Sequence, residues 1–467
     1  MNVLKNGDEE MIIPKFILTG EAKPVIQDEK KIKSRYTHAR WSVIISMIVG
    51  YGFYYVCRMA LSVIKEPAIE SGALTAIQLG VIGSLLSLVY AFGKLTNGFI
   101  ADRCNIKKFL AIGLFASAII NLLIGFYSGF IFFAVMWGIN GWFQSMGSAP
   151  CVVSLSQWYS YKEKSTWYGI WSIAHYVGEA VTFIGTAFLV VHFGWKHVFV
   201  WIGVGGIIIA YLTYKFMYDR PEAYGLPNVA DYKNDHPAIK KENKTHELST
   251  WETQLLVIKN PYVWLIGLSA MCLGIVRYAI NSWGILFLQD TQSISLITAG
   301  SLLAITPIMG GLGSFFSGII SDKIFKSRHA VTTSFFSVLM VIFIILFCFA
   351  PGNTVILGLY LAGFGFSMGV LLCFIGGMLA VALSPTRATG AAMGMIGFLS
   401  YIGAFSQDII NGILVQHAQH IEKIQTATGL KEVTTYDYHT VKIFWIVTSI
   451  LMLLFIIPTI SAKKTHE

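Results

Sequence analysis

The feature that most constrains this chain is an apolar run of about 20 residues or more, which recurs along its whole length. Twelve such runs can be counted in the 467 residues, near 41–64, 77–101, 108–127, 130–155, 166–192, 196–217, 261–288, 295–320, 330–350, 354–380, 388–414 and 441–461. A helix of that length crosses the roughly 30 Å hydrocarbon core of a bilayer. The composition agrees, with 55% hydrophobic and only 13% charged residues. We expect an all-α integral membrane protein with twelve transmembrane helices.

Lysine and arginine are distributed unevenly between the loops. They gather at 1–40, 102–108, 161–164, 218–260 and 322–329 and in the terminal KK, whereas the opposite loops are short or nearly neutral. The positive-inside rule then predicts a multi-pass protein of the plasma membrane, the inner membrane in bacteria, with both termini in the cytoplasm. This asymmetry accounts for the net charge of +9. Scattered lysines beside membrane spans do not predict a nucleic acid partner.

A polar segment divides the chain into two halves of six spans. Residues 219–252 are rich in Pro, Asn, Lys and Glu and show no apolar period. The segment 1–40 is also polar and lacks the apolar core of a cleavable signal peptide. We predict five parts: a cytosolic arm over 1–40, a six-helix bundle over 41–217, a cytosolic linker over 218–260, a second bundle over 261–461 and a cytosolic tail over 462–467. We expect the protein to be a monomer.

Short motifs repeat between the halves at a nearly constant offset. GFIADRCNIKK begins at Gly98 and GIISDKIFKSR at Gly318, while NGWFQSMG ends at Gly147 and AGFGFSMG at Gly369. SIAHYVG, over 172–178, aligns in the same way with GFLSYIG, over 397–403. An acidic residue at a helix end, followed by basic residues, can pair across the gap between helices. We therefore predict cytoplasmic gate loops at Asp102, Arg103, Asp322 and Lys323.

Two arginines lie inside apolar spans at matching positions. Arg58, in YGFYYVCRMALSV, precedes Asp102 by almost the same length of chain as Arg277, in GIVRYAINSWG, precedes Asp322. An arginine within a span costs about 2.5 to 3.5 kcal/mol on insertion scales, so it normally faces a cavity and has a partner. Snorkelling to the headgroups is the alternative, although each arginine lies two or more turns from its helix end. A parallel repeat predicts a substrate site between the halves, near the midplane.

The ligand of such a site is expected to be an anion, because no matching pair of intramembrane carboxylates neutralises the arginines. Guanidinium forks match phosphate oxygens and favour a phosphate or a phosphate ester. Lys94 and His175 are two further basic residues in the spans, with a helix-capping lysine and an ordinary core histidine as the alternatives. Glu179 and Asp408 are the candidates for proton or charge coupling; Asp408 lies near a helix end, where an interfacial position is the alternative.

An enzyme is the less favoured class. Catalysis requires a nucleophile with a base, or a metal cluster, and the spans contain no HxxxH, HxE or acidic cluster. A membrane-embedded phosphatase is therefore disfavoured, and we expect no cofactor and no metal. The six cysteines form no CxxC pair, so neither a disulfide framework nor a zinc site is expected.

The spacing of the two aspartate loops resembles the loop signature of the major facilitator superfamily. Within it, YYVCR, YAFGKLTNGFIADRCN, NGWFQSMGSAPC, WSIAHYVG, DRPEAYGLP, KNPYVWL and VRYAINSWG resemble the organophosphate:phosphate antiporter family. These motifs span residues 51–283, and TGAAMGMIGFLSYIGA extends the resemblance to about 404. DRPEAYGLP and NPYVWL look most like the hexose-phosphate sensor branch, whose members include transporters.

The resemblance implies a phosphate held by Arg58 and Arg277, with help from Lys94 and His175, and rocker-switch exchange of a phosphate ester for inorganic phosphate. Residues predicted to line the pocket are Tyr51, Tyr54, Tyr55, Ser172, Tyr176, Asn281, Trp283 and Tyr401. This polar aromatic set favours a hexose 6-phosphate, glucose 6-phosphate in particular, over glycerol 3-phosphate. A receptor that binds a hexose phosphate without transporting it would have the same clamp.

Departures from the family pattern fall around the predicted pocket. The family usually has lysine where this chain has Met59, asparagine where Ser172 and Tyr176 flank the histidine, and FGPQ where residues 366–370 read FSMGV. Glu179 stands where glycine is usual and follows His175 by four residues, so both side chains share a helix face. We predict that Glu179 pairs with His175 and keeps it cationic, with a lysine elsewhere as the alternative partner.

Overall fold

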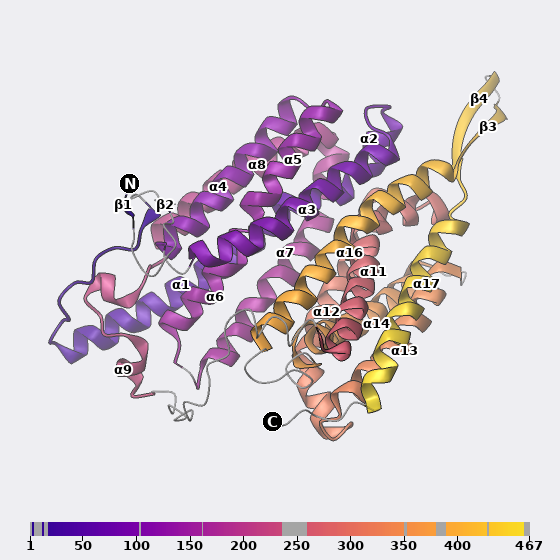
Figure 1. The fold of residues 1–467 in the computed structure, drawn as a ribbon. Helices are drawn as coiled ribbons and strands as arrows, with labels where there is room; N and C mark the ends of the chain where they lie inside the picture. The colour runs from indigo at the N-terminus through magenta and orange to yellow at the C-terminus, as the bar shows by residue number, and fades with distance from the viewer. Residues whose placement is uncertain are drawn as a thin grey trace.

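The computed structural model describes residues 2–3, 12–13, 17–101, 104–160, 162–235, 259–349, 353–379, 389–426 and 429–461, and these residues are almost entirely helical. Two helical halves lie side by side (Figure 1). The first contains α1 Glu29–Val63, α2 Lys65–Glu70, α3 Ala76–Ala101, α4 Ile106–Phe126, α5 Phe130–Gln144, α6 Ser148–Trp158, α7 Lys164–Phe193 and α8 Trp195–Phe216. The second contains α11 Pro261–Gln292, α12 Leu296–Lys323, α13 His329–Phe349, α14 Thr354–Cys373, η3 Phe374–Met378, α16 Thr389–His417, α17 His439–Ile456 and η5 Ile457–Ser461.

Within the described residues, eleven helices are long and apolar enough to cross a membrane. The remaining expected span, the fourth along the chain at 130–155, is instead two shorter helices, α5 and α6, separated at residues 145–147. Pro150, near the start of α6, has no N–H to donate to the carbonyl four residues earlier, so one helical hydrogen bond is missing where α5 and α6 join. Large apolar side chains cover the outside of the molecule, and Phe126, Ile131 and Val355 are each more than 70% exposed. Lipid is the natural partner of such a surface.

The first helix is longer than the apolar run predicted. α1 begins at Glu29, where the Asp28 side chain caps it by accepting hydrogen bonds from the Lys30 and Lys31 backbone N–H groups. Its 35 residues correspond to about 50 Å of helix at 1.5 Å per residue. Part of the predicted polar arm is therefore helical. The short elements η2 Pro221–Tyr224 and α9 Val229–Lys233 lie in the linker, and residues 236–258 of that linker lie outside the described residues.

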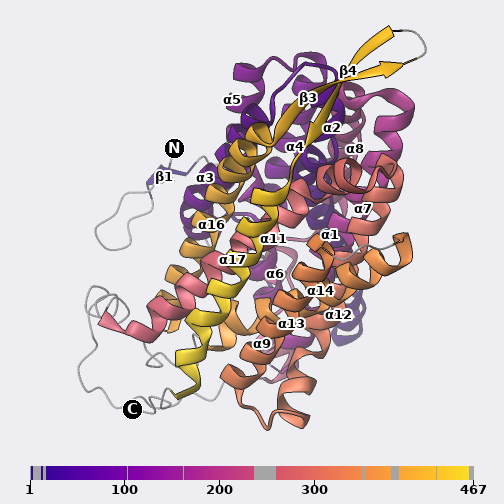
Figure 2. The same cartoon turned by 90° about the vertical axis from the view of Figure 1, so that its right-hand side faces the viewer.

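An antiparallel hairpin precedes the last helix, where no regular structure was expected. β3 Gln419–Thr426 pairs with β4 Gly429–Tyr436, in a register that sets Gln419 opposite Tyr436. The strands project beyond the helices (Figure 2). A second, minimal pair joins β1 Asn2–Val3 to β2 Ile12–Ile13. We call the end that carries α2 and β3–β4 the hairpin end, and the end that carries α9 and the start of α1 the linker end.

The two halves meet mainly through the pairs α1–α11, α3–α16 and α7–α12. On the hairpin-end side these helices touch through glycine. A Cβ atom on Gly80 of α3 would lie 2.4 Å from the Asp408 carbonyl oxygen, and one on Gly300 of α12 would lie 2.6 Å from the Phe183 carbonyl oxygen. Towards the linker end, Cβ atoms on Gly98 and Gly318 would meet no atom of the described residues within 4 Å. The halves are therefore packed together at the hairpin end and separate towards the linker end.

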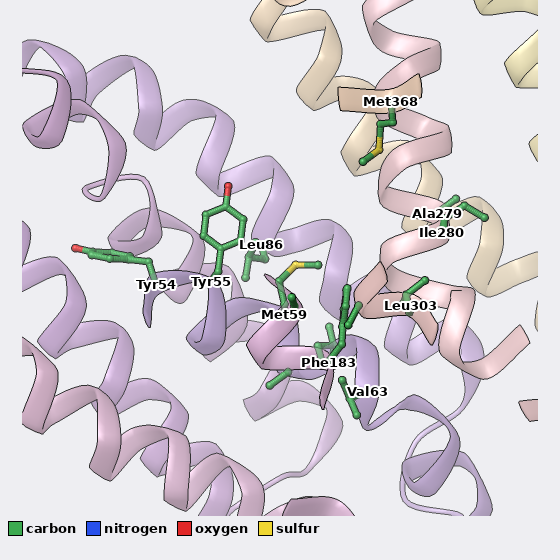
Figure 3. Close-up of a cluster of buried hydrophobic side chains, with 14 of the residues drawn as sticks. Tyr54, Tyr55, Met59, Val63, Leu86, Phe183, Ala279, Ile280, Leu303 and Met368 are labelled. Carbon is green, nitrogen blue, oxygen red and sulfur yellow. The ribbon is translucent and has the colours of Figure 1, made fainter. Parts of the chain in front are cut away.

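Apolar side chains from both halves reinforce this closure. Met59 and Val63 of α1 and Phe183 of α7 belong to the same hydrophobic cluster as Ile280 of α11 and Leu303 of α12 (Figure 3), and all five are buried. Met59, a departure from the resembled family, thus forms part of an apolar seal on the hairpin-end side of Arg58.

Candidate functional site

Two adjoining cavities lie between the halves and share Tyr278 and Tyr401. The first is lined by Arg58, Tyr90, Asn281 and Asp408 among others. The second is lined by Lys94 and Arg277 among others. One arginine from each half therefore reaches a common region, whose wall is tyrosine.

Arg58 is held by aromatic rings. Its guanidinium carbon lies 4.0 Å from the centroid of the Tyr55 ring, one turn earlier on α1, and 5.6 Å from that of Tyr90 on α3. Such contacts favour the cation without occupying its hydrogen-bond donors. The buried Nε of Arg58 has no hydrogen-bond partner within the described part of the chain. The guanidinium therefore retains donors for a ligand.

Arg277 differs from Arg58 because it has an acidic neighbour. Its Nη2 atom lies 3.9 Å from Oε2 of Glu179 on α7, and its guanidinium carbon lies 5.4 Å from the Tyr278 ring. The other oxygen of Glu179 accepts a 2.5 Å hydrogen bond from Nδ2 of Asn281 on α11. Nε of Arg277 and Oε2 of Glu179 have no hydrogen-bond partner among the described residues. The pair is thus a loose contact between the halves rather than a closed bidentate bridge.

This placement contradicts the predicted pairing of Glu179 with His175, and equally the alternative of a lysine partner. The His175 ring instead packs on Tyr176, at 3.8 Å between ring centroids, and on Tyr55, at 5.8 Å. The two side chains do share a face of α7, but a guanidinium on the facing helix offers the carboxylate a stronger electrostatic partner than an imidazole on its own helix.

Lys94 of α3 extends from the same helix as Tyr90. Its Nζ atom lies 5.1 Å from the Tyr401 ring, and its side chain is exposed on the wall of the second cavity. The Tyr90 and Tyr401 rings are 5.0 Å apart. These contacts place the lysine on the linker-end side of the tyrosines, where the halves separate.

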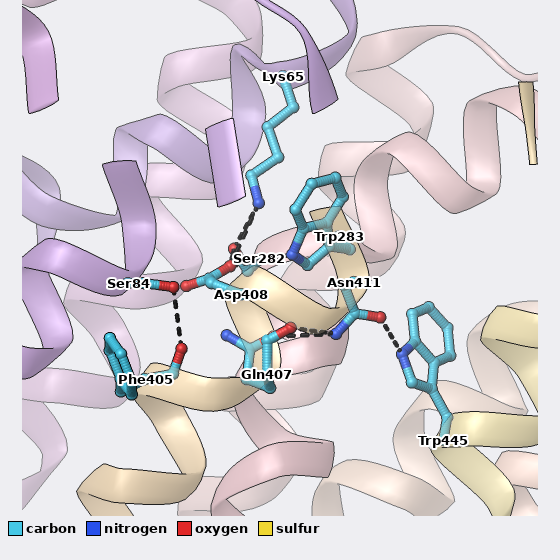
Figure 4. A network of polar contacts seen from close by, with 9 residues as sticks. All are labelled: Lys65, Ser84, Ser282, Trp283, Phe405, Gln407, Asp408, Asn411 and Trp445. Atoms are coloured by element: carbon cyan, nitrogen blue, oxygen red, sulfur yellow. Dashed lines mark hydrogen bonds and ion pairs between the residues drawn. The ribbon is translucent and has the colours of Figure 1, made fainter. Parts of the chain in front are cut away.

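A second charged network joins the halves nearer the hairpin end (Figure 4). Asp408 of α16 accepts hydrogen bonds from Oγ of Ser282, at 2.7 Å, and from Nε1 of Trp283, at 2.9 Å. Nζ of Lys65 lies 3.5 Å from the same carboxylate and 2.7 Å from Ser282 Oγ. It also lies 3.4 Å from the centroid of the Trp283 ring. Asp408 is therefore buried between the halves rather than exposed at the end of its helix.

A third carboxyl group lies at the hairpin end, outside the membrane-spanning helices. Glu66 of α2 accepts a hydrogen bond from Nε2 of Gln289 on α11. Burial, together with the nearby carboxylates of Glu70 and Asp290, raises the pKa of Glu66 to about 7. Closure of this end therefore favours the protonated form of Glu66.

Of the eight residues predicted to line the pocket, Asn281 and Tyr401 line these two cavities. Tyr54 instead donates a hydrogen bond to the Leu110 carbonyl at 2.8 Å, and Trp283 is buried beside Asp408. The remaining four pack between helices or bond elsewhere: Tyr51 lies on Trp171, Tyr55 on Arg58, Ser172 donates to the Gly169 carbonyl, and Tyr176 bonds to Ser314.

The sequence interpretation missed Lys65, Tyr90 and Tyr278. A signal existed for one of them. Tyr90 precedes Lys94 by four residues, a spacing that returns to the same face of a helix. Lys65 lies beyond the end of α1, at the start of α2. Tyr278 follows Arg277 directly, and adjacent residues on a helix point in different directions, so only the packed structure could place it.

The predicted gate loops are only partly visible. Asp102 and Arg103 lie outside the described residues. Asp322 and Lys323, at the end of α12, are exposed, and Asp322 accepts a 2.7 Å hydrogen bond from Ser327 Oγ in its own loop. The Asp322 carboxylate is therefore engaged locally in the state observed.

Residues 47–406 match the family described as Major Facilitator Superfamily. The chain belongs to the major facilitator superfamily. Two solved structures of that architecture are similar in fold. One is a bacterial homolog of the human lysosomal transporter Spinster in an inward-facing and unoccupied conformation, with a TM-score of 0.68 and 18% identity over 81% of this chain and 83% of that one. The other is the nucleoside transporter NupG, with a TM-score of 0.65 and 15% identity over 90% of this chain and 99% of that one.

Relatives within the superfamily are more similar in sequence. The membrane sensor protein UhpC of Salmonella typhimurium is 30% identical, covering 83% of this chain and 88% of the relative. A probable hexose phosphate transport protein of Chlamydia pneumoniae is 32% identical, covering 81% and 86%. The glycerol-3-phosphate transporter of Bacillus subtilis is also 32% identical, covering 83% and 89%. These relatives confirm the resemblance to the organophosphate:phosphate antiporter branch and the multi-pass membrane character of the chain.

Proposed function

We propose that this protein exchanges an organic phosphate ester for inorganic phosphate across the membrane, by alternating access. The observation that carries the proposal is the convergence of Arg58 and Arg277, one from each half, on adjoining cavities that share two tyrosines. A ligand held between them contacts both halves at once. Its binding can therefore favour one relative position of the halves over another, which any ligand must do to drive a conformational change.

The unpaired donors of the arginines favour a phosphoryl group. Both Nε atoms are buried without a partner in the described chain, and a buried donor left unsatisfied costs about 1 to 3 kcal/mol. Phosphate oxygens accept two parallel hydrogen bonds from each guanidinium fork. Lys94, on the side where the halves separate, attracts the anion as it enters, and His175 contributes a further donor beside Tyr55.

A hexose 6-phosphate, glucose 6-phosphate in particular, is the substrate we favour over glycerol 3-phosphate. The hydroxyl groups of Tyr90, Tyr278 and Tyr401 offer polar contacts beside the arginines, and a site that hydrogen-bonds substrate hydroxyls rejects analogues that lack them. Relatives named as hexose phosphate transport proteins are as similar to this chain as the glycerol-3-phosphate transporter. Membership of a superfamily of transporters also supports a protein that carries its ligand unchanged.

Counterflow in proteoliposomes tests the proposal. Vesicles are loaded with unlabelled phosphate, and uptake of labelled phosphate is measured against external glucose 6-phosphate, glycerol 3-phosphate and glucose. We expect uptake that requires internal phosphate and that glucose 6-phosphate suppresses most strongly. Absence of labelled exchange would disprove the function, whereas suppression by glycerol 3-phosphate alone would change the substrate.

A non-transporting receptor is the second candidate, and the similarity to the sensor protein UhpC favours it. A receptor would use the same arginines to bind the ester without releasing it on the other side. The discriminating result is thermal stabilisation of the purified protein by glucose 6-phosphate, together with no counterflow in vesicles that contain correctly folded protein.

A further inference from the structure

We propose that Glu179 sets the charge of the substrate that this site accepts, selecting dianionic phosphate monoesters against esters that carry an additional carboxylate. This inference rests on the proposed function and extends it to a substrate class. It starts from the inequivalence of the two arginines, since Arg277 has a carboxylate 3.9 Å away and Arg58 has aromatic neighbours.

The fixed charges of the site give a net value of +2. Arg58, Arg277 and Lys94 contribute three positive charges, and Glu179 contributes one negative charge, with His175 counted in its neutral form. Lys65 and Asp408 also lie beside the first cavity, but they form their own pair and cancel. A phosphate monoester and inorganic phosphate are mainly dianions at pH 8, so either one neutralises the site.

Neutrality matters most when the site is sealed from water on both sides. During exchange the halves must close over the ligand, and an uncompensated charge in that low-dielectric state carries a large desolvation cost. A ligand with three negative charges leaves an excess negative charge inside. Glu179 is itself only 1% exposed and accepts a hydrogen bond at its other oxygen from Asn281, so this carboxylate belongs to the site rather than to the surrounding water.

The contact geometry shows that Glu179 tunes the clamp without blocking it. Oε2 of Glu179 lies 3.9 Å from Nη2 of Arg277, beyond hydrogen-bond distance, and Nε of the same arginine is unpaired within the described residues. The guanidinium can therefore bind a phosphoryl group while the carboxylate reduces its effective charge. A glutamine at this position keeps an oxygen that accepts from Asn281, so Glu179→Gln removes the charge and retains the hydrogen bond.

The test uses two pairs of ligands that differ by one carboxylate. Glycerol 3-phosphate is compared with 3-phosphoglycerate, and glucose 6-phosphate with 6-phosphogluconate, each as a competitor of labelled phosphate exchange at pH 8. The readout is the ratio of half-inhibitory concentrations within a pair. We expect the native protein to favour the ligand without the carboxylate, and Glu179→Gln to shift the ratio by tenfold or more towards the ligand with it. Glu29→Gln, which removes an equal charge from the exposed start of α1, should leave the ratio unchanged.

A double variant separates charge from local contact. Lys94→Gln combined with Glu179→Gln restores the net charge of +2, so the ratio should return towards the native value. If Glu179→Gln folds but does not exchange phosphate, the same ratios are taken from ligand-induced thermal stabilisation in detergent. If Glu179→Gln changes the half-inhibitory concentrations of both members of each pair by the same factor, its role is purely structural and the inference is overturned. The inference is also overturned if the double variant shows the same ratio as Glu179→Gln alone. Native protein that fails to exchange labelled phosphate would instead disprove the proposed function.

Discussion

Arg58 and Arg277 occupy equivalent positions in the two halves, yet their surroundings differ. Arg58 lies over Tyr55 and has no carboxylate within the described salt bridges, whereas Arg277 is paired loosely with Glu179. Both retain a buried Nε atom that has no hydrogen-bond partner in the described part of the chain. Both arginines present a planar fork of hydrogen-bond donors, but Arg277 has a carboxylate beside it and Arg58 has aromatic rings.

We expect Arg58→Lys and Arg277→Lys each to reduce phosphate exchange by at least a hundredfold. An ammonium group keeps the charge but cannot reproduce two parallel hydrogen bonds. Labelled phosphate counterflow measures the effect, with Arg35→Lys on the exposed first turns of α1 as the matched control. Exchange at near the native rate in either variant would refute the two-arginine clamp.

The buried pair of Lys65 and Asp408 leads to a prediction about stability. Lys65→Met leaves the Asp408 carboxylate buried without a cation, which typically destabilises a protein by about 3 to 5 kcal/mol. The double variant Lys65→Met/Asp408→Asn removes both charges, so it should be less destabilised than Lys65→Met alone. Thermal unfolding in detergent gives the comparison. If the destabilisation of the double variant equals the sum of the destabilisations by Lys65→Met alone and Asp408→Asn alone, the two residues do not interact.

Among the elements, α3 and α16 carry the closest contact between the halves. We expect Gly80→Ala to push them apart at the hairpin end, because the new Cβ would lie 2.4 Å from a backbone carbonyl and 3.1 Å from the Gly412 Cα atom. Gly98→Ala adds the same methyl group to α3 where no described residue lies within 4 Å, and it serves as the control.

Spin labels at Ser71 and His417, in a background without the native cysteines, report the separation of the hairpin end. Gly80→Ala should lengthen the distance between the labels, and Gly98→Ala should leave it unchanged. Equal distances in all three proteins would mean that the α3–α16 contact does not hold the end closed.

The connection between α2 and α11 predicts a pH dependence. In the closed state the pKa of Glu66 is about 7, and in a state where this end opens to water it returns towards its ordinary value of about 4.3. The closed state thus binds the proton more tightly and is favoured as the pH falls from about 7 towards 5. Above pH 7 the carboxylate of Glu66 is ionised in both states. Closing the hairpin end then costs free energy, because it buries an ionised group.

The same pair of spin labels, followed from pH 5 to pH 8, checks this expectation. The closed population should increase several-fold at the lower pH. Glu66→Gln should remain closed throughout and lose this response. A response that persists in Glu66→Gln would assign it to another group.

The existence of most helices follows from apolar length alone, since a run of about 20 residues has few other structures available to it in a membrane. The residues at which these helices begin and end do not follow from apolar length. The start of α1 coincides with the Asp28 cap, and the fourth span is divided shortly before Pro150. The β3–β4 hairpin falls in a stretch without long apolar runs, where only strand alternation could have indicated it.

For the molecule as a whole, the arginine positions followed from the internal repeat, because equivalent residues of two related halves face a common axis. The residues that contact those arginines did not follow from the repeat. Glu179 was expected near His175, and the structure pairs it with Arg277 across the interface. Contacts between halves depend on how far each helix is rotated and shifted, and a single sequence does not encode these in any local pattern.

Orientation in the membrane is a further prediction at this scale. The distribution of Lys and Arg predicts that the linker end faces the cytoplasm. A cysteine at Ser71, at the hairpin end, should react with a membrane-impermeant maleimide in intact cells. A cysteine at Lys326, which follows α12, should react only after permeabilisation. The reverse pattern of labelling would invert the assigned topology.

The closure of the hairpin end, described above from glycine contacts and an apolar seal, has a consequence for affinity. A ligand that arrives at the linker end meets an open approach to Lys94 and the arginines, whereas one on the opposite side binds only the fraction of molecules that is open there. Apparent affinity falls by that fraction, so a state populated one part in a hundred weakens it about a hundredfold. The two faces of the membrane should therefore show different half-saturation concentrations for one and the same anion.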